Sequence, residues 1–467
     1  MNVTADKKRP AINIDVNAVI EGRARLSAAE ANTLFHSASL SDLGRWSTAM
    51  ANRILREGRL RGAAAAPHDN PPSIRTYIID RNINYTNVCS ANCTFCAFKR
   101  DLGEPDSYTL TTDQLHQKVR ELVAIGGTQV LLQGGMHPEL PIEWYEEMLR
   151  GLKSAFPKVH LHAFSPPEVV EFVAVFKLEG FPTTAPGKSH TLPREVWGAK
   201  LDAILRRLMA AGLDSIPGGG GEIFAEPVRK KIGLGKATAE QWLDVMSAAH
   251  RLGMHTSATM MFGHIEGIAD RIDHMQRIRD RQDRAIAEGW PGRYLAFISW
   301  PFQRENTPLG RVPDWDMETG EAFPGDVVAE SGDPASHSLF AKRVRMSGAT
   351  DYLRTQAISR LFLDNVHSIG SSWVTMGPKI GQLGLYFGAT DMGSVMMEEN
   401  VVSAAGTTYC LNEAVLCKLI RDSGFTPAQR DNRYNLLRVH EGDDSPDCAV
   451  TDWSQHRAKK LHVEQPA

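Results

Sequence analysis

The spacing of apolar residues predicts a helical start to the chain. Residues 26–66 carry apolar positions at helical spacing, and Ser27 with Glu30 forms the capping box that marks a helix start. Residues 63–72 then combine alanine, proline and asparagine, a composition typical of a short linker. We therefore expect residues 1–72 to form an N-terminal extension of two helices and a linker.

A regular alternation of strands and helices follows, from residue 73 to residue 435. Short apolar runs predict strands at residues 75–84, 129–133, 159–164, 214–216, 255–261, 295–300 and 368–373, with a last strand beginning near Val395. Amphipathic spacing predicts helices at residues 111–126, 142–156, 201–211, 238–252, 268–287, 350–362 and 412–423. About eight such units favour an α/β fold, a closed (β/α)8 barrel of the TIM type, over a doubly wound open sheet. The open sheet needs a glycine fingerprint after the first strand, where this chain carries cysteines.

Composition limits the partners and the location of the protein. The net charge of −3 gives no sign of a general affinity for nucleic acid or for anionic membranes. Residues 1–8 lack the apolar stretch of a secretory signal, and no apolar run reaches the roughly 18–20 residues that span a bilayer. The six cysteines form no even disulfide framework, so we expect a cytoplasmic protein.

Three cysteines supply the sharpest chemical signal. Cys89, Cys93 and Cys96 stand in the spacing C-x3-C-x2-C, and no fourth cysteine follows nearby. Thiolates hold iron–sulfur clusters, usually four for a [4Fe–4S] cube, so three would leave one iron open to a ligand from outside the protein. A zinc site with a histidine as fourth ligand is the alternative, but the nearest downstream histidine, His116, falls outside ordinary zinc spacing.

Glycines gather where the predicted strands end, which is where barrels carry their active groups. Gly134 and Gly135 form a paired turn that lets a ligand approach the backbone. Gly219 and Gly220 belong to a run of four glycines, a loop of bare amides that can wrap a nucleoside. Glu222 follows this loop and is a candidate to hold ribose hydroxyls; a flexible linker is the alternative interpretation of the loop.

Three titratable residues near strand ends are candidates for acid–base chemistry: Glu168, His264 and Glu398. Glu168 follows two prolines and could instead complement the N-terminus of the next helix. A histidine such as His264 titrates near neutrality when unperturbed. Trp300 and Trp373 suit an aromatic, sugar-bearing substrate, or else they plug the barrel ends.

The cysteine segment, with Phe95 before its last cysteine, closely resembles the radical S-adenosylmethionine superfamily. Further blocks resemble the cyclic dehypoxanthinyl futalosine synthases of menaquinone biosynthesis by the futalosine route, at residues 126–135, 160–168, 258–264, 300–303 and 398–402. The resemblance covers roughly residues 25–435. Residues 177–198 and 311–346 depart from the family pattern, and we expect both to be loop insertions. Residues 436–467 are polar, which predicts a disordered tail.

This resemblance implies two cofactors, a [4Fe–4S] cluster held by the three cysteines and S-adenosyl-L-methionine on its open iron. The residues implied to bind S-adenosylmethionine are Phe95, Gln133, Gly134, Gly135, Gly219, Gly220 and Glu222. In the implied reaction, a 5′-deoxyadenosyl radical takes a hydrogen atom from the ribose C4′ of dehypoxanthine futalosine, and the carbon radical adds to the benzoate ring of the same molecule. Glu168, His264 or Glu398 would accept the ring proton. Flavodoxin or ferredoxin is the implied electron donor.

Two sister activities on the same scaffold are alternatives. Aminofutalosine synthase adds the radical to an enolpyruvyl group, and the deazaflavin-forming synthases attack tyrosine-derived partners. A non-catalytic iron–sulfur electron-transfer protein is the alternative from another class, and it would need four protein ligands for its cluster.

Overall fold

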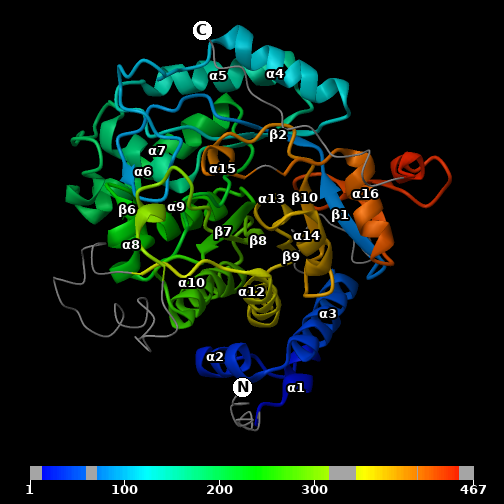
Figure 1. Ribbon diagram of the computed structural model, residues 1–467. Helices are drawn as coiled ribbons and strands as arrows, with labels where there is room; N and C mark the ends of the chain where they lie inside the picture. Colours follow the sequence, from blue (N-terminus) through cyan, green and yellow to red (C-terminus); the bar gives the residue numbers. More distant parts are fainter. Residues whose placement is uncertain (1–12, 59–70, 315–342, 408, 452–467) are drawn as a thin grey trace.

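The computed structural model describes residues 13–58, 71–314, 343–407 and 409–451. Parallel strands close into a barrel at its centre (Figure 1). The first barrel strand is β1 (Ile74–Ile78) continued by β2 (Asp80–Ile83). The others, in chain order, are β4 (Gln129–Leu132), β5 (His160–Ala163), β7 (Thr256–Phe262), β8 (Tyr294–Pro301), β9 (Ser368–Gly370) and β10 (Asp391–Ser394).

The ring of strands is complete, and every pair in it is parallel. β2 pairs with β4, β4 with β5, β7 with β8, β8 with β9, β9 with β10, and β10 with β1. The remaining step is made by single bridges, His162 with Ser215 and Ile216 with Thr256. Residues 214–216 therefore act as the expected fourth strand, although they form only these bridges. The predicted (β/α)8 barrel is confirmed.

Helices surround the barrel (Figure 1). The longer ones are α4 (Thr112–Ala124), α5 (Ile142–Ala155), α6 (Pro166–Val175), α7 (Arg194–Ala211), α9 (Ala239–Arg251), α10 (Ile268–Ala287), α12 (Ala349–Phe362) and α16 (Glu413–Asp422). Capping boxes start α4 at Thr111 and α9 at Thr238, which agrees with the helix starts predicted at residues 111 and 238. Short helices lie in the loops that follow strands: α8 (Glu226–Ile232), α13 (Trp373–Met376), α14 (Pro378–Gly384) and α15 (Val401–Ala404).

Several boundaries differ from the sequence prediction; β9, for example, ends at Gly370, and Trp373 already belongs to α13. α7 begins at Arg194, so residues 194–198 of the expected insertion are helical; Trp197 is buried there, which extends the apolar face of the helix. β10 ends at Ser394, so a strand beginning near Val395 is wrong. β10 was missed because Asp391, Gly393 and Ser394 give it no apolar run; Asp391 and Ser394 line the barrel interior, where Asp391 pairs with a buried arginine.

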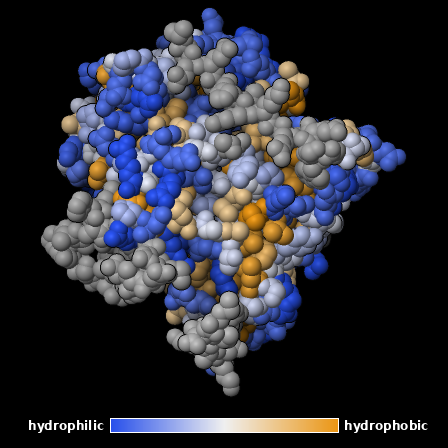
Figure 2. Space-filling model, viewed as in Figure 1, coloured by the Kyte–Doolittle hydropathy of each residue, from blue (hydrophilic) through white to orange (hydrophobic). Residues whose placement is uncertain are grey.

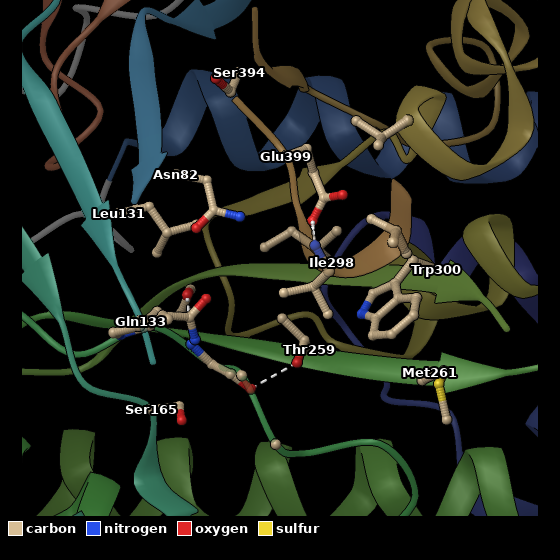
Figure 3. Close-up of a pocket in the computed structure, with 18 of the residues that line it drawn as sticks. Asn82, Leu131, Gln133, Ser165, Thr259, Met261, Ile298, Trp300, Ser394 and Glu399 are labelled. Carbon is tan, nitrogen blue, oxygen red and sulfur yellow. Dashed lines mark hydrogen bonds between the residues drawn. The ribbon is translucent and has the colours of Figure 1, made fainter. Parts of the chain in front are cut away.

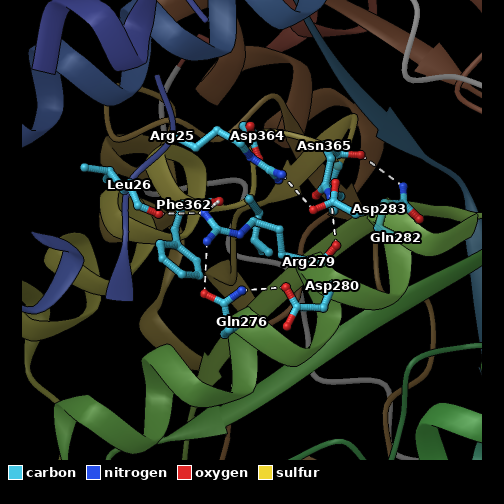
Figure 4. A network of polar contacts seen from close by, with 12 residues as sticks. Arg25, Leu26, Gln276, Arg279, Asp280, Gln282, Asp283, Phe362, Asp364 and Asn365 are labelled. Carbon is cyan, nitrogen blue, oxygen red and sulfur yellow. Dashed lines mark hydrogen bonds and ion pairs between the residues drawn. The ribbon is translucent and has the colours of Figure 1, made fainter. Parts of the chain in front are cut away.

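The N-terminal helices α2 (Ala28–Ser37) and α3 (Leu40–Glu57) pack outside the barrel against α10 and α12 (Figure 1). A third, unexpected short helix, α1 (Val16–Ile20), packs on α3. Figure 4 shows the polar contacts beside α2, where Arg25 pairs with Asp283 at 2.7 Å and with Asp364 at 2.6 Å. Arg279 of α10 donates to the carbonyl of Leu26 at 2.8 Å. The capping box at Ser27 is also present. The predicted linker at residues 63–72 falls mainly outside the described residues.

The chain continues past the barrel as an ordered extension. β11 (Thr426–Arg430) pairs in parallel with β1, and β12 (Leu436–Val439) pairs antiparallel with β11. A short 3-10 turn (Pro446–Ala449) packs on α16, where Arg421 pairs with Asp447. The expectation of a disordered tail is therefore wrong for residues 436–451. Residues 452–467, like residues 315–342 of the second expected insertion, lie outside the described residues.

Candidate active site

A cavity of about 490 Å³ runs through the interior of the barrel. Side chains alternate between the two faces of a strand, so every second residue of the first strand faces it: Ile78, Asp80, Asn82 and Asn84. The cysteine loop lies at one end of this cavity, where the carboxyl ends of the strands meet, and residues 430–434 of the C-terminal extension lie at the other. Hydrophilic residues dominate the rim of the face seen in Figure 2, and apolar residues gather nearer its middle.

The three cysteines lie together at the open end of the cavity. Cys89, Cys93 and Cys96 are each half-buried and line it. Their loop is held by a short ribbon, β3 (Asn92–Cys93) antiparallel to β6 (Gly233–Leu234). Burial raises the pKa of the Cys93 thiol to about 12, and the nearby Lys236 ammonium opposes that shift. An electropositive group beside a thiol favours its thiolate, the form that binds metal.

Among the described residues, no three His, Cys, Asp or Glu side chains are grouped closely enough to hold a single metal ion. The cysteine ligands of a four-iron cluster bind different irons, so they stand further apart than the ligands of one ion.

The paired glycines bring the second barrel strand against the cysteine loop. The amide of Gly135 donates to the carbonyl of Thr86 at 2.9 Å. A Cβ atom at Gly135 would overlap the carbonyl of Val88, and one at Gly134 would overlap the ring of Tyr85. Gln133, Gly134 and Gly135 all line the cavity. Only glycine therefore allows this close approach of backbone to cysteine loop.

Glu168 lies beside this turn and is fully engaged. It accepts hydrogen bonds from the Tyr85 hydroxyl at 2.5 Å, the Gly134 amide at 3.0 Å, and the amide and hydroxyl of Ser165 at 2.8 Å and 2.6 Å. Burial raises its pKa to about 7, against the opposing effect of these donors. It lines the cavity, but its geometry is that of a capping box on α6 tied to the glycine turn. Glu168 thus fixes the turn in place.

The four-glycine loop forms the adjoining wall. Gly219 and Gly220 line the cavity; a Cβ at Gly219 would overlap the Gln133 amide, and one at Gly220 would overlap the ring of Pro167. Trp242 donates its indole N–H to the Gly219 carbonyl at 3.0 Å. These contacts tie the loop to regular elements, so a flexible linker does not describe it.

Glu222 and Lys236 form an ion pair close to the cysteines. Their side chains meet at 2.6 Å, and both are nearly buried. The second carboxylate oxygen of Glu222, Oε2, is buried and has no hydrogen-bond partner among the described residues. The Lys236 ammonium lies 4.9 Å from the centre of the Phe95 ring, which also lines the cavity. Lys236 was not identified from the sequence, because only the preceding Gly233 and Gly235 mark a turn there.

Two of the predicted acid–base residues are not in the cavity. His264 is completely buried; its Nδ1 accepts from the Ile265 amide at 2.8 Å and its Nε2 lies 3.2 Å from the Met261 carbonyl. Burial lowers its pKa. It does not line the cavity, so the structure gives the predicted action of His264 on substrate no support.

Glu398 does not line the cavity either. It is buried in an ion-pair cluster with Arg81 at 2.6 Å and Lys118 at 2.9 Å, away from the cavity. Its neighbour Glu399 lines the cavity instead. The sequence contains both carboxylates in one pair, and nothing in that pair indicates which of them faces inward.

The middle of the cavity combines polar and apolar side chains, as Figure 3 shows. Leu131, Met261, Ile298 and Trp300 form apolar wall, while Asn82 and Glu399 extend polar groups into the same space. Trp300 is half-buried and Trp373 buried, and both line the cavity. The arrangement can hold a molecule with an aromatic part and a hydroxyl-bearing part.

No helix in the described ranges is both long and apolar enough to cross a membrane.

Comparison with known proteins places these features in a family. Residues 83–278 match the radical SAM superfamily, and residues 336–442 match the CofH/MqnC C-terminal region. The chain is 38% identical over 417 residues to the cyclic dehypoxanthine futalosine synthase of Halalkalibacterium halodurans, an alignment that covers 89% of this chain and 93% of that protein.

Two further relatives carry other names. The 5-amino-6-(D-ribitylamino)uracil–L-tyrosine 4-hydroxyphenyl transferase of Methanopyrus kandleri is 36% identical over 78% of this chain and 85% of its own length. The aminodeoxyfutalosine synthase of Thermus thermophilus is 34% identical over 78% of this chain and 84% of its own length.

Among solved structures, a methylornithine synthase aligns with a TM-score of 0.55 at 16% identity, over 88% of this chain and 97% of that one, which shows a shared fold. The sequence relatives show the family as well as the fold, because their identity to this chain extends over most of both chains. The chain therefore belongs to the radical S-adenosylmethionine superfamily, and within it to the family of the cyclic dehypoxanthine futalosine synthases and their sister enzymes.

Proposed function

We propose that this protein converts dehypoxanthine futalosine to cyclic dehypoxanthinyl futalosine, a step of menaquinone biosynthesis. The observation that carries the proposal is the 38% identity to a relative of that name over nearly the whole of both chains. The cavity supports it, because an open cysteine triplet, a glycine-lined wall and a mixed polar and apolar interior meet in one space.

Members of the superfamily use a [4Fe–4S] cluster and S-adenosylmethionine, and the residues here fit both. Three half-exposed thiols supply three ligands, one fewer than a [4Fe–4S] cube usually takes. The Gly134–Gly135 turn has no side chains to cover its backbone beside these thiols. The oxygen of Glu222 that has no partner among the described residues is suited to accept hydroxyl or ammonium hydrogens. When bound, the pair of cofactors supplies a radical that abstracts hydrogen.

Each of the remaining cofactor-site residues has a proposed positioning role. Gln133, Gly134, Gly135, Gly219, Gly220 and Glu222 would surround S-adenosylmethionine, with Phe95 beside it. Lys236, paired with Glu222, would fix that carboxylate and place a positive charge near Cys93. Glu168 would hold the glycine turn at its position through the Gly134 amide.

The barrel interior would hold dehypoxanthine futalosine. Apolar side chains from three strands, Leu131, Ile298 and Trp300 among them, form a wall that can take a benzoate ring and keep water from it. Positioning is the main contribution of the protein, because a displacement of about 1 Å can cost a hundredfold in rate.

The proposal includes an electron donor and a cellular location for the enzyme. An iron–sulfur protein or flavoprotein of the ferredoxin or flavodoxin type would donate the electrons. A cytoplasmic location suits the chain, because a reducing compartment keeps its six cysteines as thiols.

Anaerobic turnover tests the proposal. Protein reconstituted with iron and sulfide is incubated with a reductant, S-adenosylmethionine and dehypoxanthine futalosine, and products are identified by mass spectrometry. We expect 5′-deoxyadenosine together with a cyclised product that is lighter than dehypoxanthine futalosine by two hydrogens. Formation of product only from the substrates of the sister enzymes, an enolpyruvyl benzoate or tyrosine, would contradict the proposed activity.

A further inference from the structure

Asn82 stands out among the side chains that face the cavity. It lies on β2, it is 6% exposed, and its amide oxygen is buried with no hydrogen-bond partner among the described residues. An unpaired buried polar group of this kind costs about 1–3 kcal/mol. The adjacent inward residues of the strand are satisfied: Asp80 accepts from Gln129 at 2.9 Å, and Asn84 donates to the Gln133 carbonyl at 3.1 Å. Asn82 is thus positioned to meet something that enters the cavity.

Glu399 supplies a second polar group to the same space. Its two carboxylate oxygens accept from the amides of Val401 at 3.1 Å and Ser403 at 2.8 Å, which orients the side chain. A carboxylate has about four lone-pair sites, so two backbone donors leave others free to accept hydroxyl hydrogens. The segment that carries Glu399 is fastened to the end of the first barrel strand, since Asn400 donates to Asn84 at 3.1 Å.

The rest of this part of the cavity is apolar. Leu131 of β4 and Ile298 and Trp300 of β8 project toward the space into which Asn82 and Glu399 extend (Figure 3), and Met261 of β7 lines the same cavity. Neither Asn82 nor Glu399 lies on a glycine loop, and among the described residues neither forms a hydrogen bond or ion pair with Glu222. The two therefore form a polar patch separate from the residues assigned to the cofactors.

We propose that Asn82 and Glu399 bind the sugar hydroxyls of dehypoxanthine futalosine, a nucleoside that has lost its base, while the apolar wall of Leu131, Ile298 and Trp300 takes its aromatic ring. The inference rests on the proposed function and deepens it, because it names the residues that orient the sugar relative to the ring. A carboxylate accepts two hydroxyl hydrogens, and the amide accepts one and donates one, which matches a vicinal diol. A site that hydrogen-bonds a substrate hydroxyl also rejects molecules without it, because its own polar groups would stay unpaired.

Binding without turnover tests this inference directly. Dissociation constants are measured for reconstituted protein with S-adenosylmethionine and no reductant. Calorimetry serves for dehypoxanthine futalosine, and ligand-observed NMR serves for 3-acetylbenzoate, an analogue that keeps the aromatic ring and lacks the sugar. We expect Asn82→Ala and Glu399→Gln each to weaken nucleoside binding about tenfold. Both variants should bind the sugar-free analogue as the wild type does.

Matched controls remove the same groups elsewhere on the chain. Asn32→Ala changes a half-buried amide on α2, and Glu195→Gln changes an exposed carboxylate on α7; neither residue lines the cavity. Both should bind the nucleoside with the wild-type constant. Should Asn82→Ala fail to fold, Asn82→Asp preserves its shape, removes the donor, and is expected to weaken nucleoside binding similarly.

Two results would overturn the inference. In one, the variants bind the nucleoside as tightly as the wild type; in the other, they lose the same factor for 3-acetylbenzoate, which would indicate a general disturbance of the cavity. In both cases the wild type still converts the nucleoside, so the proposed function stands. A wild type that neither binds nor converts the nucleoside overturns the proposed function and this inference together.

Discussion

The two ends of the barrel are built on opposite principles. At the end sealed by the C-terminal extension, Arg430 makes two hydrogen bonds to Asp391, at 2.5 Å and 3.0 Å, and lies 4.0 Å from the centre of the Tyr434 ring. Asn432 donates to Gln129, which donates in turn to Asp80. The polar groups at this end are paired with each other, and these pairs hold the barrel closed.

The cysteine end has the opposite arrangement, with groups left open to a ligand. Its thiols are half-exposed, its walls are glycine, and Glu222 keeps an oxygen without a partner among the described residues. Barrel enzymes separate stability from chemistry in this way, with chemistry at the carboxyl ends of the strands. The comparison teaches that the ion pairs of the sealed end hold the barrel together, whereas the unpaired oxygen of Glu222 lies beside the space open to small molecules.

Removal of one cysteine should eliminate the function of the open end and leave the ion pairs of the sealed end unchanged. Cys93→Ala is expected to abolish cluster binding and activity, because two remaining thiols cannot retain the cluster. Iron and sulfide per chain, with the visible absorption of the reconstituted protein, measure the effect. Cys448→Ala is the control, since Cys448 is exposed on the C-terminal extension; loss of iron in that variant would contradict the assignment of ligands.

The opposite change, at the sealed end, should affect stability. Arg430→Met leaves the buried Asp391 carboxylate without its guanidinium, which typically costs about 3–5 kcal/mol. Urea unfolding measures the loss, and iron content per folded chain should not change. Arg438→Met is the control on the same extension: its pair with Asp444 is exposed, and its loss should cost less than about 0.5 kcal/mol. Equal effects of the two changes would remove the distinction between the ends.

Much of this comparison could be predicted from the sequence, though unevenly. Alternation of apolar runs predicted the barrel, and the spacing of Cys89, Cys93 and Cys96 predicted the open end. The sealed end was not predicted, because a polar turn at residues 430–434 has the composition of a loop, and its partners, such as Asp391, are distant in the chain. Pairings of that kind depend on closure of the barrel, which local patterns do not encode.

The individual carboxylates show the same limit. Glu398 and Glu399 are neighbours, yet Arg81 and Lys118 bind the first while the second faces the cavity. Asn82 could have been found, because alternation along residues 78–84 places it on the same face as Ile78. His264 is a buried structural residue, since its ring is satisfied by the backbone of its own loop.

A smaller change sharpens the contrast by adding one methyl group at the open end. Gly135→Ala would force the cysteine loop away from the glycine turn, a form of overpacking that costs about 1–3 kcal/mol. We expect weaker S-adenosylmethionine binding by about tenfold, measured by equilibrium dialysis. Gly198→Ala is the control, because a Cβ there meets open space on α7; it should stabilise the helix by about 0.5–1 kcal/mol and leave binding unchanged.

The last expected effect is a pH dependence at Glu168. Its pKa in the folded protein is raised to about 7 by burial, above the ordinary 4.5. A raised carboxyl pKa stabilises the folded state fully below about pH 4.5, and this contribution is lost as pH rises toward 7. Denaturant unfolding from pH 5 to 8 should therefore show the wild type losing about 1–3 kcal/mol relative to Glu168→Gln. Parallel curves for the two proteins would contradict a raised pKa.

The claim that the cysteine end is left incomplete for a small molecule can be measured directly by electron paramagnetic resonance of the reduced, reconstituted protein. Addition of S-adenosylmethionine should change the cluster signal of the wild type, because the molecule would join the coordination of an iron that the protein leaves open. A signal that stays the same at saturating S-adenosylmethionine would mean that the protein ligates every iron, and would contradict the account.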